Sequence, residues 1–292
     1  MNIKDNPLVA KNNDKYNSIP FSKINSTHFI PAIAHGISEA SNAIELICKE
    51  PSSPGFENTI VRFEHAFEIL ENSVTVFYHY FASVADDSIR ALVSDISDMN
   101  AKFNNDIYLN NDLFLKIKQV YDNKKNLNLN PDDQRLLDET YDSFIRSGAN
   151  LSDLDKKTYR EISERLSQLS PKYSNNVLNA TNEINDYWIT SSESLKGIPS
   201  NSIEAAKLYA EEKGRPSDWC FTLDTNFGIL LKSCDSQQVR EDIFRKYGSK
   251  CNGGEHDNSS ILKEISKLRD QKAKLLSFDT HADYVLDRRM AK

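Results

Sequence analysis

The sequence predicts an all-α, mainly helical fold of long antiparallel helices, with at most a few short β-strands near residues 187–223. Only 9 of the 292 residues are glycine, well below the average share of about 7%. Apolar residues recur at steps of three and four along most of the chain, as they do on one face of an α-helix. The strands are predicted from two short β-prone runs, YWIT (187–190) and WCFTL (219–223).

Two long apolar stripes predict the first helices. Ser26 or Thr27 is expected to cap a helix whose stripe is Phe29, Ile33, Ile37, Ala40, Ile44 and Ile47. After breaks at Pro51 and Pro54, a second stripe alternates steps of three and four without a slip: Ile60, Phe63, Phe67, Leu70, Val74, Phe77, Phe81 and Val84. We expect this second stripe to form one helix and the central core of the first domain.

Shorter helices are predicted next. One is expected to start near Asp87, and another to run from Asp112 to about Tyr121. Pro131 suits the first position of a further helix, and Gly148 suits the left-handed residue that ends it.

The stretch after Gly148 begins with a helix cap. Ser152 and Asp155 have the spacing of a capping box, and the stripe behind them is Tyr159, Ile162, Leu166, Leu169, Tyr173 and Val177. Pro171 lies inside this stripe and removes one main-chain donor, which predicts a kink or a break. Helical spacing returns at Val239, Ile243, Phe244 and Tyr247, at Ile261, Leu262, Ile265, Leu268 and Leu275, and at Tyr284, Leu286 and Met290.

The change of pattern near residues 185–220 predicts a domain boundary. We expect an N-terminal helical domain, 1–185, and a second, mostly helical domain with short strands that begins at 186 and continues to 292. No repeat of fixed period occurs.

The charge balance excludes some partners. There are 36 basic and 43 acidic residues, a net charge of −7, and no basic block. This composition argues against nucleic acid and anionic membranes as partners. Four scattered cysteines without a C-x-x-C motif indicate reduced thiols, so we expect a cytoplasmic protein.

The search for catalytic chemistry yields no assignment. No two of the six histidines lie four residues apart, so the chain contains no H-E-x-x-H zinc motif, and none has an acidic residue three positions before it. In 252-NGGEHDN-258, Glu255, His256 and Asp257 could bind a cation. We favour instead a loop in which Asp257 or Asn258 caps the next helix. We therefore predict no catalytic residue and no metal ligand, and leave substrate-binding residues unassigned.

Five stretches resemble a known family: 51-PSSPGFENTI-60, 105-NDIYLNNDLF-114, 144-FIRSGANLS-152, 253-GGEHDNSSIL-262 and 286-LDRRMAK-292. In this order they resemble the N-terminal part of peptidyl-dipeptidases, or dipeptidyl carboxypeptidases, in the thimet oligopeptidase family of zinc metallopeptidases. The second and third stretches look closer to peptidyl-dipeptidases than to the oligopeptidase A branch.

The resemblance implies a non-catalytic half of a longer enzyme. Family members carry H-E-x-x-H and a third glutamate ligand in a half that these residues do not contain. Zinc is therefore implied for the full-length enzyme and no cofactor for this part, and 186–292 would be the start of the peptidase domain. The implied partners are short unstructured peptides, cut to release C-terminal dipeptides, and the other half of the same chain. These residues would form one wall of the substrate channel.

Two alternatives stay open on the residues alone. The chain could be a stand-alone helical adaptor without enzymatic activity, or an independent helical metalloenzyme. The missing ligand spacings argue against the second of these.

Overall fold

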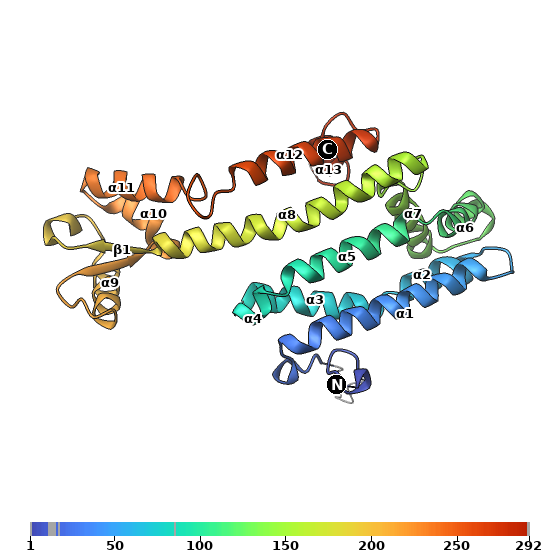
Figure 1. Cartoon of the computed structure of the whole chain (residues 1–292), viewed down its shortest axis with the longest axis horizontal. Coiled ribbons are helices and arrows are strands. Elements are labelled where there is room, and N and C mark those ends of the chain that lie inside the picture. The colour runs from blue at the N-terminus through green and yellow to red at the C-terminus, as the bar shows by residue number, and fades with distance from the viewer. Residues whose placement is uncertain (1, 11–15, 17, 85, 291–292) are drawn as a thin grey trace. The chain divides into compact units, whose positions relative to one another are not determined.

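The computed structural model describes residues 2–10, 16, 18–84 and 86–290. As predicted, the fold is all α with one small antiparallel sheet (Figure 1). No helix of the described residues is long and apolar enough to cross a membrane. The chain divides into two compact units, Met1–Pro171 with Lys267–Lys292, and Lys172–Ser266. The domain boundary at 185 stays a prediction about the complete protein.

The helices of the first unit precede and follow those of the second. The first unit contains α1 (Phe29–Lys49), α2 (Arg62–His65), α3 (Glu68–Ser83), α4 (Asp87–Arg90), α5 (Val93–Tyr108), α6 (Asn111–Asp122), α7 (Pro131–Arg146) and α13 (His281–Leu286). The second unit contains α9 (Ser200–Glu212), α10 (Leu223–Ser233), α11 (Gln237–Gly248) and the strands β1 (Asp186–Ile189) and β2 (Trp219–Thr222). Helices α8 (Asp153–Asn185) and α12 (Ser259–Leu275) contribute residues to both units.

The start of α1 differs from the prediction. Asn25, and not Ser26 or Thr27, is the cap: its side-chain oxygen accepts from the Thr27 amide at 3.0 Å, and a short 3₁₀ turn leads into the helix. Asn25 can act as the cap because the 3₁₀ turn Ser26–His28 brings the free amides at its start to the Asn25 side chain. The predicted stripe of α1 is confirmed, with Phe29, Ile33, Ala40, Ile44 and Ile47 buried.

The long phenylalanine stripe is core, but it is not one helix. It begins in a π-helical turn, Phe56–Val61, continues through α2, and breaks at Ala66–Phe67 before α3. The break arises because the Ala66 amide bonds to the Phe63 carbonyl, three residues back. Four members of the stripe are buried, Ile60, Phe63, Leu70 and Phe77, and three more pack against them, Phe67, Val74 and Phe81.

The prediction that Val84, the last member of that stripe, belongs to the core is wrong. Val84 is 55% exposed, because α3 ends at Ser83 and the residue lies beyond its packed face. The helix predicted from Asp87 is likewise two helices, α4 and α5, separated by a turn at Ala91–Leu92.

The predicted helix ends around α7 and α8 are confirmed. Pro131 is the first residue of α7, and Gly148 has a φ of +90°. Ser152 and Asp155 bond to each other in both senses: the Ser152 hydroxyl donates to the Asp155 carboxylate at 2.7 Å and accepts from the Asp155 amide at 3.2 Å. Of the kink or break predicted at Pro171, the break is wrong, since α8 runs through this residue. One missing main-chain donor did not end a helix of 33 residues.

The second unit contains the predicted strands. β1 pairs antiparallel with β2, and Asp186 faces Thr222 across the pair. Leu223, predicted as the end of the second strand, instead begins α10, which the sequence analysis missed because its run LDTNFGILL has no long apolar stripe. The core of this unit is Tyr187, Ile189, Leu195, Ile198, Ala206, Phe221, Leu223, Leu230, Cys234, Val239 and Ile243.

Four further residues of the predicted stripes are exposed: Phe244, Leu262, Leu286 and Met290. Phe244 on α11 is 64% exposed and Leu262 on α12 is 52% exposed, because each is next in sequence to a residue that takes the buried position. Met290 is fully exposed, since α13 ends at Leu286.

Candidate functional site

The glycine-rich loop 252–258 closes on its own aspartate. One Asp257 carboxylate oxygen accepts from the Gly253 amide at 3.0 Å, the Ser259 amide at 3.0 Å and the Ser259 hydroxyl at 2.7 Å. These bonds hold the pKa of the Asp257 carboxyl below its usual value, with the hydroxyl contributing most. Gly253 and Gly254 have φ of +90° and +76°, which few other residues adopt. The predicted cap of α12 is confirmed at Asp257.

Asn258 fastens this loop to the second unit's part of α8. Its side chain is only 4% exposed. The amide nitrogen donates to the Tyr173 carbonyl at 3.0 Å, and the oxygen accepts from the Asn176 amide at 2.9 Å. A buried amide with both ends bonded stabilises the arrangement. Its role could not be read from the sequence, since its partners lie 82 and 85 residues away.

The loop also brings His256 next to a carboxylate from α8. Its Nε2 lies 3.0 Å from a Glu183 carboxylate oxygen. Ligand atoms of Glu183, Glu255 and His256 lie within 4.8 Å of one another, and both glutamates are exposed. The structure thus joins Glu255 and His256 with Glu183 and not with Asp257, whose carboxylate is used as the cap. A half-buried histidine beside an exposed carboxylate needs no metal to explain it.

The remaining histidines have structural or surface positions. His28 is buried, and its Nδ1 accepts from the Asn25 amide at 3.0 Å. His65 and His79 are exposed, and the ring of His79 lies 5.6 Å from that of Phe21.

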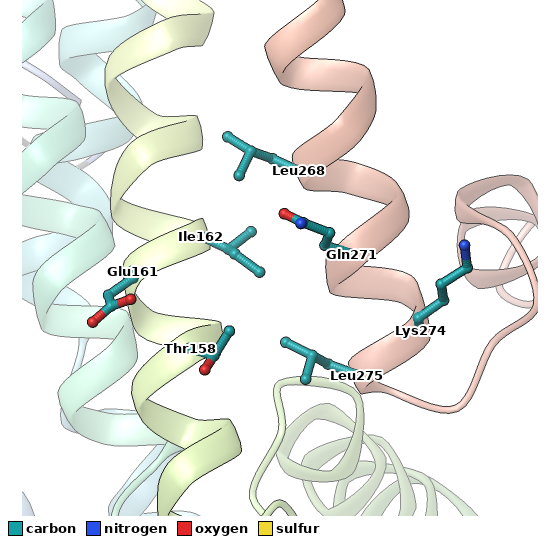
Figure 2. A pocket seen from close by; sticks show the side chains of 7 residues that line it. All are labelled: Thr158, Glu161, Ile162, Leu268, Gln271, Lys274 and Leu275. Atoms are coloured by element: carbon teal, nitrogen blue, oxygen red, sulfur yellow. The ribbon is translucent and has the colours of Figure 1, made fainter.

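An apolar groove lies in the first unit between α8 and α12. Its volume is about 600 Å³. Figure 2 shows Ile162 from α8 and Leu268 and Leu275 from α12 facing the gap, while Lys274 points away from it. Such a lining can take up apolar side chains, but it presents no pair of groups placed for acid–base or nucleophilic chemistry.

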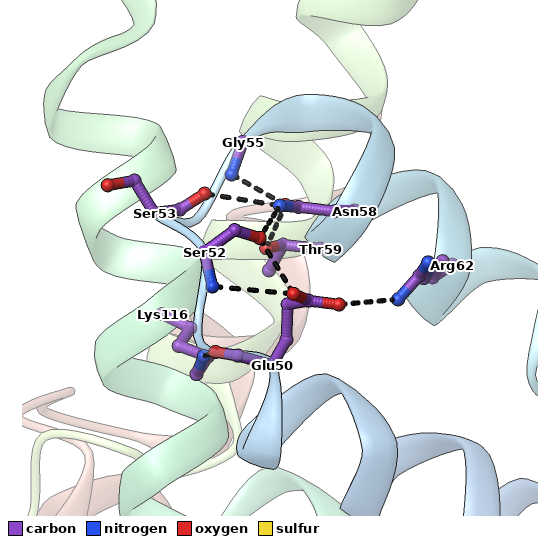
Figure 3. A network of polar contacts seen from close by, with 8 residues as sticks. All are labelled: Glu50, Ser52, Ser53, Gly55, Asn58, Thr59, Arg62 and Lys116. Atoms are coloured by element: carbon purple, nitrogen blue, oxygen red, sulfur yellow. Dashed lines mark hydrogen bonds and ion pairs between the residues drawn. The ribbon is translucent and has the colours of Figure 1, made fainter.

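The motif 51-PSSPGFENTI-60 forms a polar network after α1, drawn in Figure 3. Asn58 accepts from the Gly55 amide at 2.7 Å and donates to the Ser53 carbonyl at 3.1 Å. Glu50 joins the network through the Ser52 hydroxyl, at 2.8 Å. The carboxylate of Glu50 also pairs with Arg62 at 3.2 Å. The main-chain carbonyl of Glu50 accepts from the Lys116 ammonium at 2.7 Å. This motif fixes a turn.

Other motif residues connect distant elements. Lys156, 8% exposed, donates to the Asn111 side chain and to the Leu109 carbonyl, which lie in the stretch 105–114. Arg146, in the stretch 144–152, pairs with Asp287 at 2.6 Å. The stretches singled out in the sequence are therefore caps, turns and ties between helices. They hold helices and turns of the fold in place.

The sequence is similar to those of known peptidases. Residues 230–292 match the family described as Peptidase family M3. The chain is 27% identical to the dipeptidyl carboxypeptidase of Salmonella typhimurium, over 99% of this chain and 43% of that protein. It is also 27% identical to oligopeptidase A of Escherichia coli, over 98% of this chain and 42% of that protein. Saccharolysin of Saccharomyces cerevisiae is 25% identical over 88% of this chain and 35% of that protein.

The chain thus spans about two fifths of the length of the first two of these relatives. Equal identity to both does not separate the peptidyl-dipeptidase branch from the oligopeptidase A branch. The chain is thus similar to dipeptidyl carboxypeptidases and oligopeptidases A, and its residues 230–292 match peptidase family M3.

Proposed function

We propose that this chain is the non-catalytic part of a longer zinc-dependent peptidase, and that it forms one wall of a channel for short peptides. The observation that carries the proposal is the 27% identity to a dipeptidyl carboxypeptidase over 99% of this chain but only 43% of that protein. We propose further that the complete enzyme releases dipeptides from the C-termini of unstructured peptides.

The family implies zinc, and the residues of this chain do not fit a catalytic zinc site. No two histidines have the spacing of H-E-x-x-H. The group Glu183, Glu255 and His256 offers one imidazole and two exposed carboxylates, and the imidazole nitrogen already bonds to Glu183. A catalytic zinc usually has three protein ligands that hold it in a shielded cavity. No catalytic step is therefore assigned to these residues.

The contribution that these residues can make is steric. Polar contacts such as Lys156 to Asn111 and Arg146 to Asp287 hold packed helices in place. A rigid helical wall admits an extended peptide strand but excludes a folded domain. This supports selection of substrates by size and lack of structure.

The test compares residues 1–292 with the complete open reading frame. Zinc content is measured by mass spectrometry and cleavage with a quenched fluorogenic peptide. We expect one zinc and chelator-sensitive dipeptide release from the complete protein, and neither from residues 1–292. Stoichiometric zinc with cleavage by residues 1–292 would refute the proposal. A reading frame without H-E-x-x-H would favour the stand-alone adaptor.

A further inference from the structure

A second, polar pocket of about 440 Å³ lies in the first unit. It is separate from the loop 252–258 and plays no part in the proposed function. Helices α5, α8, α12 and α13 all contribute to its lining. The lining residues with hydrogen-bonding or charged groups that matter here are Asn105, Tyr159, Ser163, Ser167, Lys272 and Tyr284.

Lys272 brings a cation into this pocket without a carboxylate partner. Its ammonium lies 3.4 Å from the Ser163 hydroxyl and 4.5 Å from the centre of the Tyr159 ring. Among the described residues, no aspartate or glutamate forms an ion pair with it. Burial lowers the pKa of the Lys272 amine, and the nearby Tyr284 phenol opposes this effect. Buried charges in proteins are normally paired, so this ammonium lacks the anion that would compensate it.

Asn105 adds an unused donor to the same pocket. The residue is 4% exposed, and its side-chain nitrogen has no hydrogen-bond partner within the part of the chain that is described. A buried donor left unbonded is costly, and native proteins contain few of them. The same pocket therefore holds two groups that can bind an acceptor: the unbonded Asn105 amide nitrogen and the Lys272 ammonium.

The positive field extends beyond Lys272. Burial, and then the charges of Arg269 and Lys272, lower the pKa of the His281 imidazole. The Nδ1 of His281 is a second buried nitrogen without a partner among the described residues. Two positive charges, Arg269 and Lys272, thus act on the His281 ring, which also carries an unbonded nitrogen.

We propose that this pocket binds a small oxyanion, a carboxylate or a phosphate-like group, between the Lys272 ammonium and the Asn105 amide, with the hydroxyls of Ser163 and Ser167 as further donors. One ligand of this class supplies the missing counter-charge and the missing acceptor together. Bonds from an ammonium to an oxyanion are stronger than bonds between neutral groups, and the volume of the pocket suits a small molecule.

The test is isothermal titration calorimetry of the 292-residue chain with sodium sulfate and, separately, sodium acetate. Chloride keeps the ionic strength constant, so that only specific binding gives a saturable signal. We expect one site. Tighter binding of sulfate would identify a phosphate-like ligand, and tighter binding of acetate a carboxylate.

Two variants and one control locate the site. Lys272→Met should weaken binding by about tenfold or more, the loss expected for a charged hydrogen bond. Asn105→Leu should also weaken binding, yet leave the melting temperature unchanged or higher, because it removes a buried donor that has no partner. Lys267→Met, a change of the same kind at an exposed position of α12, should leave binding unchanged. If Lys272→Met does not fold, Asn105→Leu still decides.

The pH dependence gives an independent readout. Besides Ser163, the titratable groups near Lys272 are Tyr159 from α8, Tyr284 and His281 from α13, and Tyr108 from α5, which lines the same pocket. Sulfate does not change its charge at neutral or alkaline pH and favours the protonated amine. Its affinity should therefore fall as pH rises through the lowered pKa of Lys272. Absence of saturable binding by either anion, or equal weakening by Lys267→Met, would overturn the proposal.

Discussion

The Arg146 guanidinium at the end of α7 pairs with the Asp287 carboxylate just past α13, at 2.6 Å across 141 residues of sequence. The same guanidinium donates to the Tyr284 carbonyl and lies over the Tyr284 ring, 4.5 Å from its centre. Arg146 has only 15% of its side chain exposed. It thus ties α13 to α7, beside the ion pairs that Arg288 forms with Glu139 and Asp142 of α7.

We predict that Arg146→Met loosens α13 by about 1–3 kcal/mol, the value of hydrogen bonds to a charged group. Hydrogen exchange read by mass spectrometry should show faster exchange in residues 281–287 and unchanged exchange in α1. The control is Arg245→Met, which removes an arginine whose side chain is 75% exposed and which pairs with Glu241 on its own helix. Equal protection of α13 in both variants would contradict the assigned role of Arg146.

The phenylalanine stripe gives a graded prediction of stability. Phe77 is fully buried, so Phe77→Ala should cost about 3–5 kcal/mol in the free energy of unfolding. Phe67 packs against the core but is only partly buried, so Phe67→Ala should cost less. Val84→Ala, at a position 55% exposed, should change stability by less than about 0.5 kcal/mol.

Urea denaturation followed by far-ultraviolet circular dichroism measures the free energy of unfolding of all three variants. The order of loss, Phe77 above Phe67 above Val84, is the outcome that matters. A larger loss for Val84→Ala than for Phe77→Ala would show that the stripe packs in a different register.

The sequence was informative where structure is decided locally. The cap formed by Ser152 and Asp155 was predicted, because these residues are three positions apart. The left-handed conformation of Gly148 was also predicted, because it concerns a single residue. The exposure of Val84 was not, because periodicity alone does not say where a helix ends. The break at Ala66–Phe67 also escaped, since a stripe that passes through a turn keeps its spacing.

The hydrogen bonds that build the loop 252–258 and the polar pocket could not be predicted from the sequence, for a different reason. Asn258 bonds to residues 82 and 85 positions away, and Lys272 meets Ser163 across 109 positions. A single asparagine or lysine in a helical pattern is usually solvent-exposed. Only the packing of α12 on other helices shows which of its lysines is enclosed.

Metal binding at the loop 252–258 is tested by His256→Ala. We expect a change in stability of only a few tenths of a kcal/mol and no change in the metal content of the purified chain, because His256 bonds to an exposed glutamate. Asn258→Ala should cost about 1–3 kcal/mol, since it leaves buried partners unbonded. A stoichiometric metal ion that is lost with His256 would show that Glu183, Glu255 and His256 form a metal site.

The cap of α12 predicts a dependence of stability on pH. Three hydrogen bonds lower the pKa of Asp257 in the folded chain. A group whose folded pKa is depressed stabilises the fold fully above its unfolded pKa, which is about 3.9 for aspartate, and this contribution is lost as pH falls through the folded pKa. Asp257→Asn should therefore be less stable than the parent chain at neutral pH, and the difference should close in strong acid.

Urea unfolding of both proteins at neutral pH and at a pH below the folded pKa, set by a carboxyl titration in NMR, measures this difference. Glu255→Gln is the matched control, because Glu255 lies in the same loop and accepts none of the three hydrogen bonds that Asp257 accepts. Its effect on stability should not change over the same pH range. A difference for Asp257→Asn that stays constant down to strong acid would mean that the ionised carboxylate does not hold the loop, and that the cap works equally well with an uncharged acceptor.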